Sequence, residues 1–326
     1  MFTKVVKKKQ MKPINKEALL AKLGRVVVLK GGTSAEREIS LASGSAVFNG
    51  LERLGVDASV IDVGEDIIER LEVCKPDLVF IALHGREGED GVIQGLLEMM
   101  RLPYTGSKVL ASALAMNKVK SKQVWSQMNL KTAEYEILNA QTDYGDLIER
   151  LSKIVVKPVN GGSSLGISIV DNKQDLVIEF EKARAFDSEI MAEKFIPGLE
   201  FSTGVIGNKV LPTVQLETTR KFFDYDAKYT DANTEIICPV NVESKKLKEL
   251  EELVLDAYKG LGCEGLARVD VIQGEEGDFS LLELNTIPGM TEHSFVPTAM
   301  KKVGVSFDEL LLLILGDHME HMTNET

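Results

Sequence analysis

Four polar residues at alternating positions of two strand-like runs have the types and spacing for catalysis. Arg268 and Asp270 are two residues apart in one apolar run, and Glu283 and Asn285 are two apart in the next. Residues two apart on a strand point to the same face. A Gly-Glu-Glu-Gly segment between the runs predicts a turn that pairs them as a β-hairpin. One face of that hairpin then presents all four side chains together.

Asp270, Glu283 and Asn285 offer oxygen ligands of the kind that Mg²⁺ takes while it keeps waters and nucleotide phosphates in its other positions. Arg268 adds a permanent planar cation for a phosphoryl group or an oxyanion. The alternative is a solvated hairpin whose outward residues are merely polar. The flanking Leu and Val residues argue against it, because they indicate buried strands, and buried charges need partners.

A second candidate is the loop after Lys157, which reads Pro-Val-Asn-Gly-Gly-Ser-Ser-Leu-Gly and includes Ser163 and Ser164. Glycines let backbone N–H groups approach an anion, and serines add hydroxyl donors. The loop is not a Walker A motif, and by itself it is equally compatible with a flexible turn. Together with Lys118 and Arg268, it favours nucleotide binding.

The segment Glu193-Lys194-Phe195-Ile196 ends a predicted strand before Pro197-Gly198. A strand-to-linker junction of this kind can hydrogen-bond an adenine through its backbone. An ordinary interdomain hinge would have the same sequence pattern.

The elements that must position these residues belong to a chain of 326 residues, which is longer than a usual single domain. The net charge of −12 argues against general nucleic-acid binding. No apolar run approaches the roughly 20 residues that cross a bilayer, and the basic N-terminus lacks the apolar segment of a signal peptide. We therefore expect a cytoplasmic protein with no membrane or nucleic-acid partner. Three widely spaced cysteines indicate free thiols.

The order of elements predicts an N-terminal extension at 1–24 and a first domain at 25–116. In that domain, strands at 25–29, 58–63 and 77–83 alternate with helices at 43–54 and 67–74. Their unbroken apolarity is typical of parallel strands covered on both faces. Two glycine-bearing loops follow strand C-termini, where ligands bind in open α/β sheets. The extension shows no core pattern, so we expect residues 1–22 to be dispensable.

A small α+β unit is predicted at 117–199, and a strand-rich unit at 200–326 with a hairpin turn at Gly207-Asn208. Helices are expected from Val296 and from Phe307. The aperiodic segment 218–235 contains four aromatic residues. Loops this long in compact domains are often functional, which favours a lid.

Several motifs in order along the chain resemble those of the D-alanine–D-alanine ligases of the ATP-grasp superfamily, from about Arg25 to the C-terminal helix. They are Gly31–Ser40, Ala82–Gly91, Pro103–Ser107, Met116–Lys118, Val156–Pro158, Gly162–Ser164, Asp226–Tyr229, Arg268–Asp270 and Glu283–Ser294. The resemblance implies an α/β and α+β architecture: a three-domain ATP-grasp fold with an N-terminal parallel-sheet domain.

The resemblance also implies ATP and two Mg²⁺ ions, which Mn²⁺ can replace, with Asp270, Glu283 and Asn285 as metal ligands and Glu283 bridging the ions. The implied ATP-binding residues are Lys118, Lys157, Ser163, Ser164, Glu193, Lys194, Phe195, Ile196, Glu200 and Lys228. Lys118 and Lys157 match phosphate lysines, Glu193 and Glu200 match acidic residues at the adenine and ribose, and Lys228 matches a lid lysine.

In the amino-acid site, the resemblance assigns the first D-alanine ammonium to Glu36, with His84 in the same subsite, and the second D-alanine carboxylate to Ser294. Arg268 and the Gly289 N–H match the oxyanion hole. His84 could alternatively serve only to hydrogen-bond neighbouring backbone. Ser163 and Tyr229 complete the implied catalytic set, with the Tyr229 hydroxyl bonded to Ser163 and Glu36.

The implied reaction joins two D-alanines through a D-alanyl phosphate for peptidoglycan precursors, in a homodimer formed through the N-terminal unit. One alternative is another ATP-grasp carboxylate–amine ligase, against which the paired amino-acid site argues. A catalytically silent nucleotide-binding regulator would lack a metal ligand or a phosphate lysine, and none is missing. Depsipeptide-forming relatives replace the lid tyrosine, so Tyr229 favours D-alanine as the second substrate.

Overall fold

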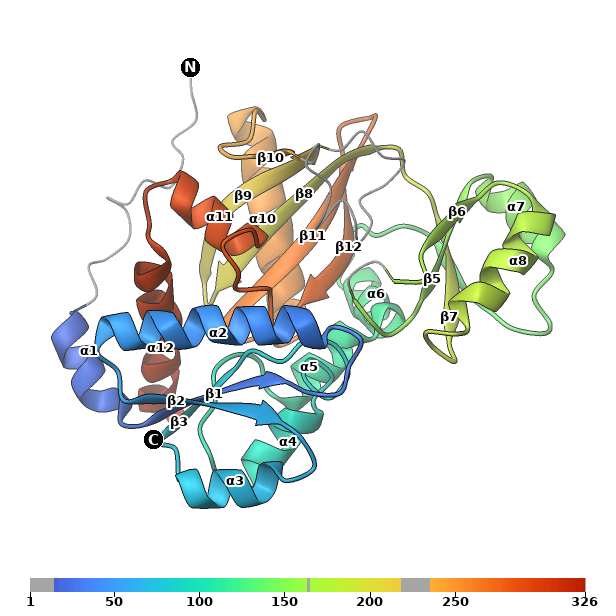
Figure 1. Cartoon of the computed structure of the whole chain (residues 1–326). Coiled ribbons are helices and arrows are strands. Elements are labelled where there is room, and N and C mark those ends of the chain that lie inside the picture. The colour runs from blue at the N-terminus through green and yellow to red at the C-terminus, as the bar shows by residue number, and fades with distance from the viewer. Residues whose placement is uncertain (1–14, 163–164, 218–234, 326) are drawn as a thin grey trace.

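The computed structural model describes residues 15–162, 165–217 and 235–325. These residues form three sheets flanked by helices (Figure 1). The N-terminal sheet is parallel, as predicted, and its strand order is β2-β1-β3. Its strands are β1 (Val26–Gly31), β2 (Ala58–Val63) and β3 (Leu78–Ile81).

Alternate residues of β1 pack into different cores on the two faces of this sheet. Val26 and Val28 join a core with α2 and with the last helix, α12 (Phe307–Glu325), whereas Val27 and Leu29 join a core with α3 and α4. Both faces are thus covered, which explains the unbroken apolarity of the strand. The helices before and within this layer are α1 (Lys16–Leu23), α2 (Arg37–Leu54), α3 (Ile67–Cys74), α4 (Val92–Met99) and α5 (Val109–Met116).

Helix α2 begins at Arg37, six residues before the predicted start at Ser43. Tertiary contacts stabilise its first turn. The Arg37 guanidinium forms two hydrogen bonds with Asp62 of β2, at 2.7 and 2.6 Å. The Ser40 hydroxyl accepts from Gly31 N and donates to Ala82 O. The earlier start puts Glu36 at the N-cap of α2, where the helix dipole favours a carboxylate.

The expectation that the N-terminal extension makes no core contact is wrong for its helical part. Leu19 and Leu23 of α1 are buried in the core that also contains Val26 and residues of α12. Helix α1 has only eight residues, which is too few for the hydrophobic period to identify a buried face from sequence.

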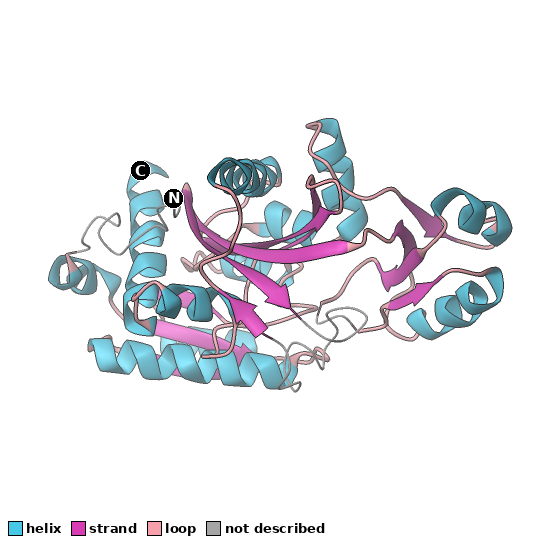
Figure 2. Ribbon diagram, turned by 90° about the horizontal axis from the view of Figure 1, so that it is seen from above, coloured by secondary structure: helices cyan, strands magenta, loops and turns pink. Residues whose placement is uncertain are grey.

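The middle of the chain forms a four-stranded antiparallel sheet with the order β4-β7-β5-β6. Helices α7 and α8 cover one face of this sheet, and Figure 2 shows the unit at one end of the molecule. The elements are α6 (Lys118–Gln127), β4 (Tyr135–Leu138), α7 (Tyr144–Leu151), β5 (Ile154–Pro158), β6 (Ser168–Val170), α8 (Lys173–Ala183) and β7 (Ile190–Lys194).

The C-terminal part contains a five-stranded antiparallel sheet with the order β10-β9-β8-β11-β12. The elements are β8 (Gly198–Ile206), β9 (Lys209–Glu217), β10 (Glu235–Ile237), α10 (Ser244–Gly260), β11 (Leu266–Gly274), β12 (Phe279–Asn285), α11 (Phe295–Lys302) and α12 (Phe307–Glu325). Both predicted hairpins are confirmed: β8 and β9 meet at Gly207-Asn208, and β11 and β12 at 275–278. Most of the predicted lid, 218–234, lies outside the described residues.

Helix α12 returns from this sheet to pack beside α2, so the last helix shares a core with the first sheet (Figure 1). Within the described ranges, no helix is both long and apolar enough to cross a membrane.

Candidate functional site

The hairpin β11–β12 brings the four polar residues of the sequence pattern together. Asp270 lies directly opposite Glu283, and Arg268 lies opposite Asn285. The register shifts after Asp270, at a β-bulge. Bulges often occur beside functional sites, where they reorient side chains.

Arg268 and Asp270 form a two-pronged ion pair within β11. Arg268 Nε lies 2.9 Å from Asp270 Oδ1, and Nη2 lies 2.7 Å from Oδ2. The Ser202 hydroxyl donates to Asp270 Oδ1 at 2.6 Å, and the guanidinium lies over the Phe295 ring. Planar pairing of this kind fixes the orientation of the guanidinium.

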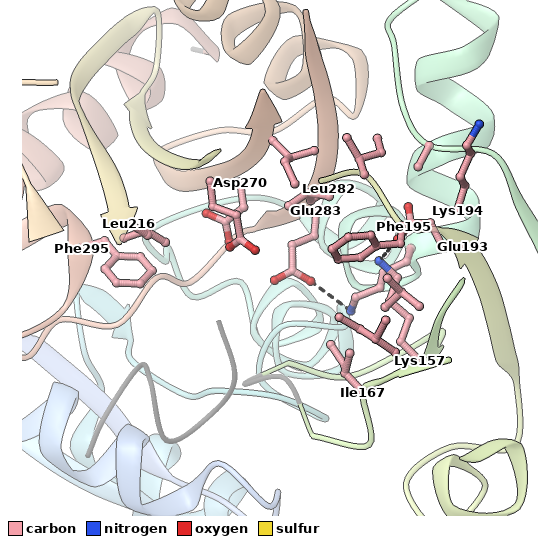
Figure 3. A pocket seen from close by; sticks show the side chains of 17 residues that line it. Lys157, Ile167, Glu193, Lys194, Phe195, Leu216, Asp270, Leu282, Glu283 and Phe295 are labelled. Carbon is pink, nitrogen blue, oxygen red and sulfur yellow. Dashed lines mark ion pairs between the residues drawn. The ribbon is translucent and has the colours of Figure 1, made fainter. Parts of the chain in front are cut away.

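A large pocket lies between the two antiparallel sheets (Figure 3). Asp270 and Glu283 reach into it from the five-stranded sheet, while Lys157 and Phe195 approach from the other side. All the described residues of the predicted ATP set line this pocket: Lys118, Lys157, Glu193, Lys194, Phe195, Ile196 and Glu200.

Apolar side chains from both sheets complete the pocket wall, and sequence reasoning did not identify them. They include Ile167, Ile169, Leu216, Ile272 and Leu282. The combination of an apolar wall with a few placed polar groups is typical of ligand pockets. An adenine ring is an apolar plane with hydrogen-bonding edges, and this lining suits it.

Lys118 connects the glycine-rich loop to the hairpin. Its ammonium donates to Gly161 O at 2.6 Å and lies 3.3 Å from Glu283 Oε2. The side chain is buried, although it lines the pocket. Lys118 therefore holds a positive charge between the loop and the predicted metal ligands.

Glu193 is buried between two lysines, only one of which sequence reasoning identified. Its carboxylate pairs with Lys157 through one oxygen and with Lys122 of α6 through the other. Burial alone would raise the pKa of Glu193, but the two ammonium groups outweigh it and lower that pKa. Burial lowers the pKa of Lys122, and Glu193 opposes that shift. The position of Lys122, four residues after Lys118 on one helix, was the available signal.

Lys194 is the last residue of β7, and residues 195–197 connect it to β8 of the other sheet. The Lys194 side chain is exposed and points away from the pocket in Figure 3, whereas Phe195 lies toward it. Lys194 thus contributes to the pocket mainly through its backbone and side-chain stem, in keeping with the sequence interpretation of a linker that offers backbone groups.

A second pocket adjoins the first and gathers the predicted amino-acid residues. Glu36, His84, Arg268, Gly289 and Ser294 line it, together with Glu283, Asn285, Phe295, Ile39 and His293. Glu283 and Phe295 line both pockets. The N-terminal layer and the five-stranded sheet therefore share one composite site.

Gly289 and Ser294 lie close together at the start of α11. A Cβ on Gly289 would stand only 2.7 Å from Ser294 Oγ, so any larger residue would collide with it. The Ser294 hydroxyl accepts from Thr291 N at 3.1 Å. Ser294 is also the N-cap residue of α11, and helix N-termini favour carboxylates.

His84 and Glu89 are buried titratable groups beside the second pocket. His84 Nε2 lies 3.1 Å from Ser43 Oγ, and that hydroxyl also accepts from Met290 N. Burial, and then the nearby Arg268 charge, lower the pKa of His84 to about 4, so the ring is neutral at pH 7. The predicted alternative of a purely structural histidine is thus compatible with its contacts.

Sequence reasoning gave Glu89 no role. Its carboxyl accepts from Gly85 N at 2.6 Å. Burial, with a further contribution from Glu36, raises the pKa of Glu89 to about 8. A buried carboxyl held neutral beside a ligand pocket is a frequent feature of functional sites.

Glu36 approaches both neighbouring glycine loops. A Cβ on Gly85 would lie 2.8 Å from its Oε2, and a Cβ on Gly162 would lie 3.0 Å from the same oxygen. Ser163, Ser164, Lys228 and Tyr229 lie outside the described residues, so their predicted roles stay predictions.

The donor set on the hairpin fits a hard cation. Two opposed carboxylates and one amide face the pockets. The parts of the chain that the structure describes hold no cluster of three or more His, Cys, Asp or Glu side chains suited to a metal. Mg²⁺ commonly uses one or two carboxylates and takes its other ligands from phosphates and water.

A pocket between two antiparallel sheets, with an adjoining pocket completed by a parallel α/β layer, defines the ATP-grasp class of fold. The chain belongs to the D-alanine–D-alanine ligase family. A family model described as "D-ala D-ala ligase C-terminus" matches residues 124–316, and one described as "D-ala D-ala ligase N-terminus" matches residues 66–107.

Relatives named D-alanine–D-alanine ligase match this chain over nearly their full length. A D-alanine–D-alanine ligase of Saccharophagus degradans is 47% identical over 297 residues, covering 91% of this chain and 95% of the relative. A D-alanine–D-alanine ligase of Ectopseudomonas mendocina is 46% identical, with 91% and 95% coverage. The Bacillus anthracis D-alanine–D-alanine ligase complexed with ATP has a TM-score of 0.81 at 30% identity, covering 93% of this chain and all of that one.

Proposed function

We propose that this protein catalyses the ATP-dependent ligation of two D-alanines to D-alanyl-D-alanine, for peptidoglycan precursor synthesis. The observation that carries this proposal is the junction of the two pockets, which share Glu283 and Phe295. A nucleotide in the first pocket and a carboxylate in the second would meet beside Arg268. The family membership and the named relatives support the same activity.

In the nucleotide pocket, the adenine would lie against the apolar wall and the linker at 194–196, and the ribose would lie near Glu200. The triphosphate would extend toward Lys157 and Lys118, with Ser163, Ser164 and Lys228 closing over it. The support for this orientation is that Lys118 lies 3.3 Å from Glu283 and that Lys157 lines the same pocket as the hairpin carboxylates.

The first step is transfer of the γ-phosphoryl group to the carboxylate of the first D-alanine. Glu36 would hold the ammonium of that D-alanine, with His84 in the same subsite. A carboxylate oxygen attacks the γ-phosphorus, the bond to ADP breaks, and D-alanyl phosphate forms. Lys118, Lys157 and Arg268 offset the charge that spreads over the phosphoryl oxygens.

The second step is attack by the amine of the second D-alanine on the acyl carbon. Ser294 would hold the carboxylate of this D-alanine at the N-terminus of α11. Arg268 and the Gly289 N–H would stabilise the tetrahedral oxyanion, and a single such donor typically contributes roughly 3 kcal/mol. The amine loses a proton and phosphate departs. Ser163 and Tyr229 would link the glycine-rich loop and the segment 218–235 to Glu36 and exclude water.

Asp270, Glu283 and Asn285 would hold two Mg²⁺ ions. When bound, these ions would supply charge neutralisation at the phosphate oxygens. The opposed carboxylates and the proximity of Lys118 to Glu283 support a site built around polyphosphate.

We further propose three domains with an N-terminal extension, at 1–24, 25–116, 117–199 and 200–326, and a homodimer formed through the N-terminal domain. Exposed apolar side chains on α4 and α5, including Val92, Met99 and Leu110, support the dimer. Light scattering of wild-type protein and of Met99→Glu tests it. A wild-type monomer at micromolar concentration would contradict it.

Phosphate release and product analysis test the activity across D-alanine, L-alanine, D-serine and D-lactate. D-Alanine should give ADP, phosphate and D-alanyl-D-alanine, and L-alanine should give nothing. D-Serine is included because a D-Ala:D-Ser ligase of Enterococcus faecalis has a TM-score of 0.78 at 31% identity. Folded protein that is inactive with D-alanine but active with another acid would establish a different carboxylate–amine ligase.

A further inference from the structure

Lys122 is a fully buried lysine whose role the reaction described above leaves open. Its ammonium pairs with Glu193, and it donates to Thr132 Oγ1 and, at 3.2 Å, to Ala133 O. An ammonium has three donors, and here buried protein groups take all of them. Burying a lysine is costly unless it is paired, so this arrangement needs a physical reason.

The charge on the pocket wall provides a physical reason for burying Lys122. Glu193 uses one carboxylate oxygen for Lys122 and the other for Lys157, which lines the nucleotide pocket. Two ammonium groups and one carboxylate leave one net positive charge. Without Lys122, the carboxylate would neutralise Lys157, and this group of side chains would carry no net charge toward a triphosphate.

The strand register and the helix spacing bring these charged side chains together. Glu193 of β7 pairs with Val155 of β5, so Glu193 and Lys157 share one face of the sheet. Lys118 and Lys122 are one turn apart on α6, so they share one face of the helix. Helix α6 thus directs one lysine to Glu283 and the other to Glu193.

We propose that Lys122 is a positioning residue for nucleotide binding, which occupies one oxygen of Glu193 so that Lys157 keeps its positive charge for the ATP phosphates. This inference rests on the proposed function, because it assigns the phosphates to the Lys157 side of the pocket. Lys122 itself does not touch the nucleotide.

The test is calorimetric binding of AMP, ADP and ATP to wild-type protein and to Lys122→Met, which removes the charge but keeps an unbranched side chain. The dissociation constant for ATP should rise roughly tenfold, from one unit charge acting over about 10 Å at an effective dielectric constant of about 20. The loss should shrink from ATP to ADP to AMP, and the KM for D-alanine should stay within twofold of wild type.

Lys120→Met is the matched control, because Lys120 is exposed on the same helix and its ammonium donates to the nearby Gln123 Oε1 at 3.2 Å. It removes the same charge and should leave nucleotide binding unchanged. Equal losses for all three nucleotides in Lys122→Met would show a purely structural role and overturn the inference. So would an unchanged affinity for ATP.

A second background keeps the test decisive if Lys122→Met folds poorly. Glu193→Gln removes the carboxylate, and Lys122→Met/Glu193→Gln restores the single net charge. In the Glu193→Gln background Lys122 has no carboxylate oxygen to occupy, so adding Lys122→Met there should weaken ATP binding by much less than tenfold. A further loss of roughly tenfold in the double variant relative to Glu193→Gln would show that Lys122 acts independently of Glu193, and it would refute the inference alone. Wild-type protein that binds no ATP would instead refute the proposed function.

Discussion

Glu89→Gln should change how the stability of this protein depends on pH. The wild-type carboxyl is buried and accepts from Gly85 N, and its pKa is raised from an ordinary 4.5 to about 8. Glutamine keeps the size of the side chain and one accepting oxygen, but it cannot ionise. The substitution therefore isolates the effect of the carboxyl charge.

The sign follows from proton binding. Between pH 4.5 and about 8, the folded chain holds a proton on Glu89 that the unfolded chain has lost, so the free energy of unfolding falls as pH rises. From pH 6.5 to 8, this group should lower the free energy of unfolding by about 1–2 kcal/mol. The lowered pKa of His84 makes its own contribution, which is largest below pH 6.5 and fades above it, and that contribution cancels in the comparison because both proteins contain His84.

The measurement is chemical denaturation at several pH values between 6.5 and 8, followed by circular dichroism. Glu89→Gln should gain stability relative to wild type as pH rises. Glu87→Gln is the control, because Glu87 is exposed in the same loop. Difference infrared spectra at pH 7 should also lose a protonated-carboxyl band in Glu89→Gln. A pH-independent stability difference, with no such band in wild type, would refute the buried neutral carboxyl.

Three further expectations follow. Leu23→Ala should lower the free energy of unfolding by about 2–4 kcal/mol, because Leu23 is buried in the core with α12. Thermal or chemical denaturation measures this loss, and an unchanged stability would show that α1 does not dock. Glu283→Gln should lower turnover by at least roughly 100-fold while the fold survives, since it removes the carboxylate between Lys118 and the opposed Asp270. Near-normal phosphate release at saturating Mg²⁺ would contradict the metal assignment. Tyr229→Phe should reduce dipeptide synthesis modestly and allow ester formation with D-lactate, and product analysis showing neither change would remove Tyr229 from selectivity.

Local sequence pattern was sufficient where one short-range signal dominates. The strand at 58–63 and the helix at 67–74 have the predicted boundaries. The hairpin β11–β12 also follows the prediction, because alternating side chains and a Gly-Glu-Glu-Gly turn specify its pairing. The motifs of the ligase family then identified the residues that gather in the two pockets.

Long-range contacts decided what the pattern could not. Helix α2 starts at Arg37 because Asp62, on another strand, binds that side chain. Helix α1 is part of the core because Leu19 and Leu23 meet α12 from the opposite end of the chain. Periodicity reports which face of an element is apolar, but it does not report which distant element covers that face.

The sequence by itself determined which residue types end each strand, and hence the chemistry that the chain offers. Only the tertiary structure decided that Lys122 shares Glu193 with Lys157, and that Glu283 and Phe295 join the two pockets. The physical reason is that these contacts depend on how separate sheets pack against one another. Ser43 shows this most directly, since its hydroxyl accepts from Met290 N, 247 residues later, at the boundary between the first layer and the last sheet.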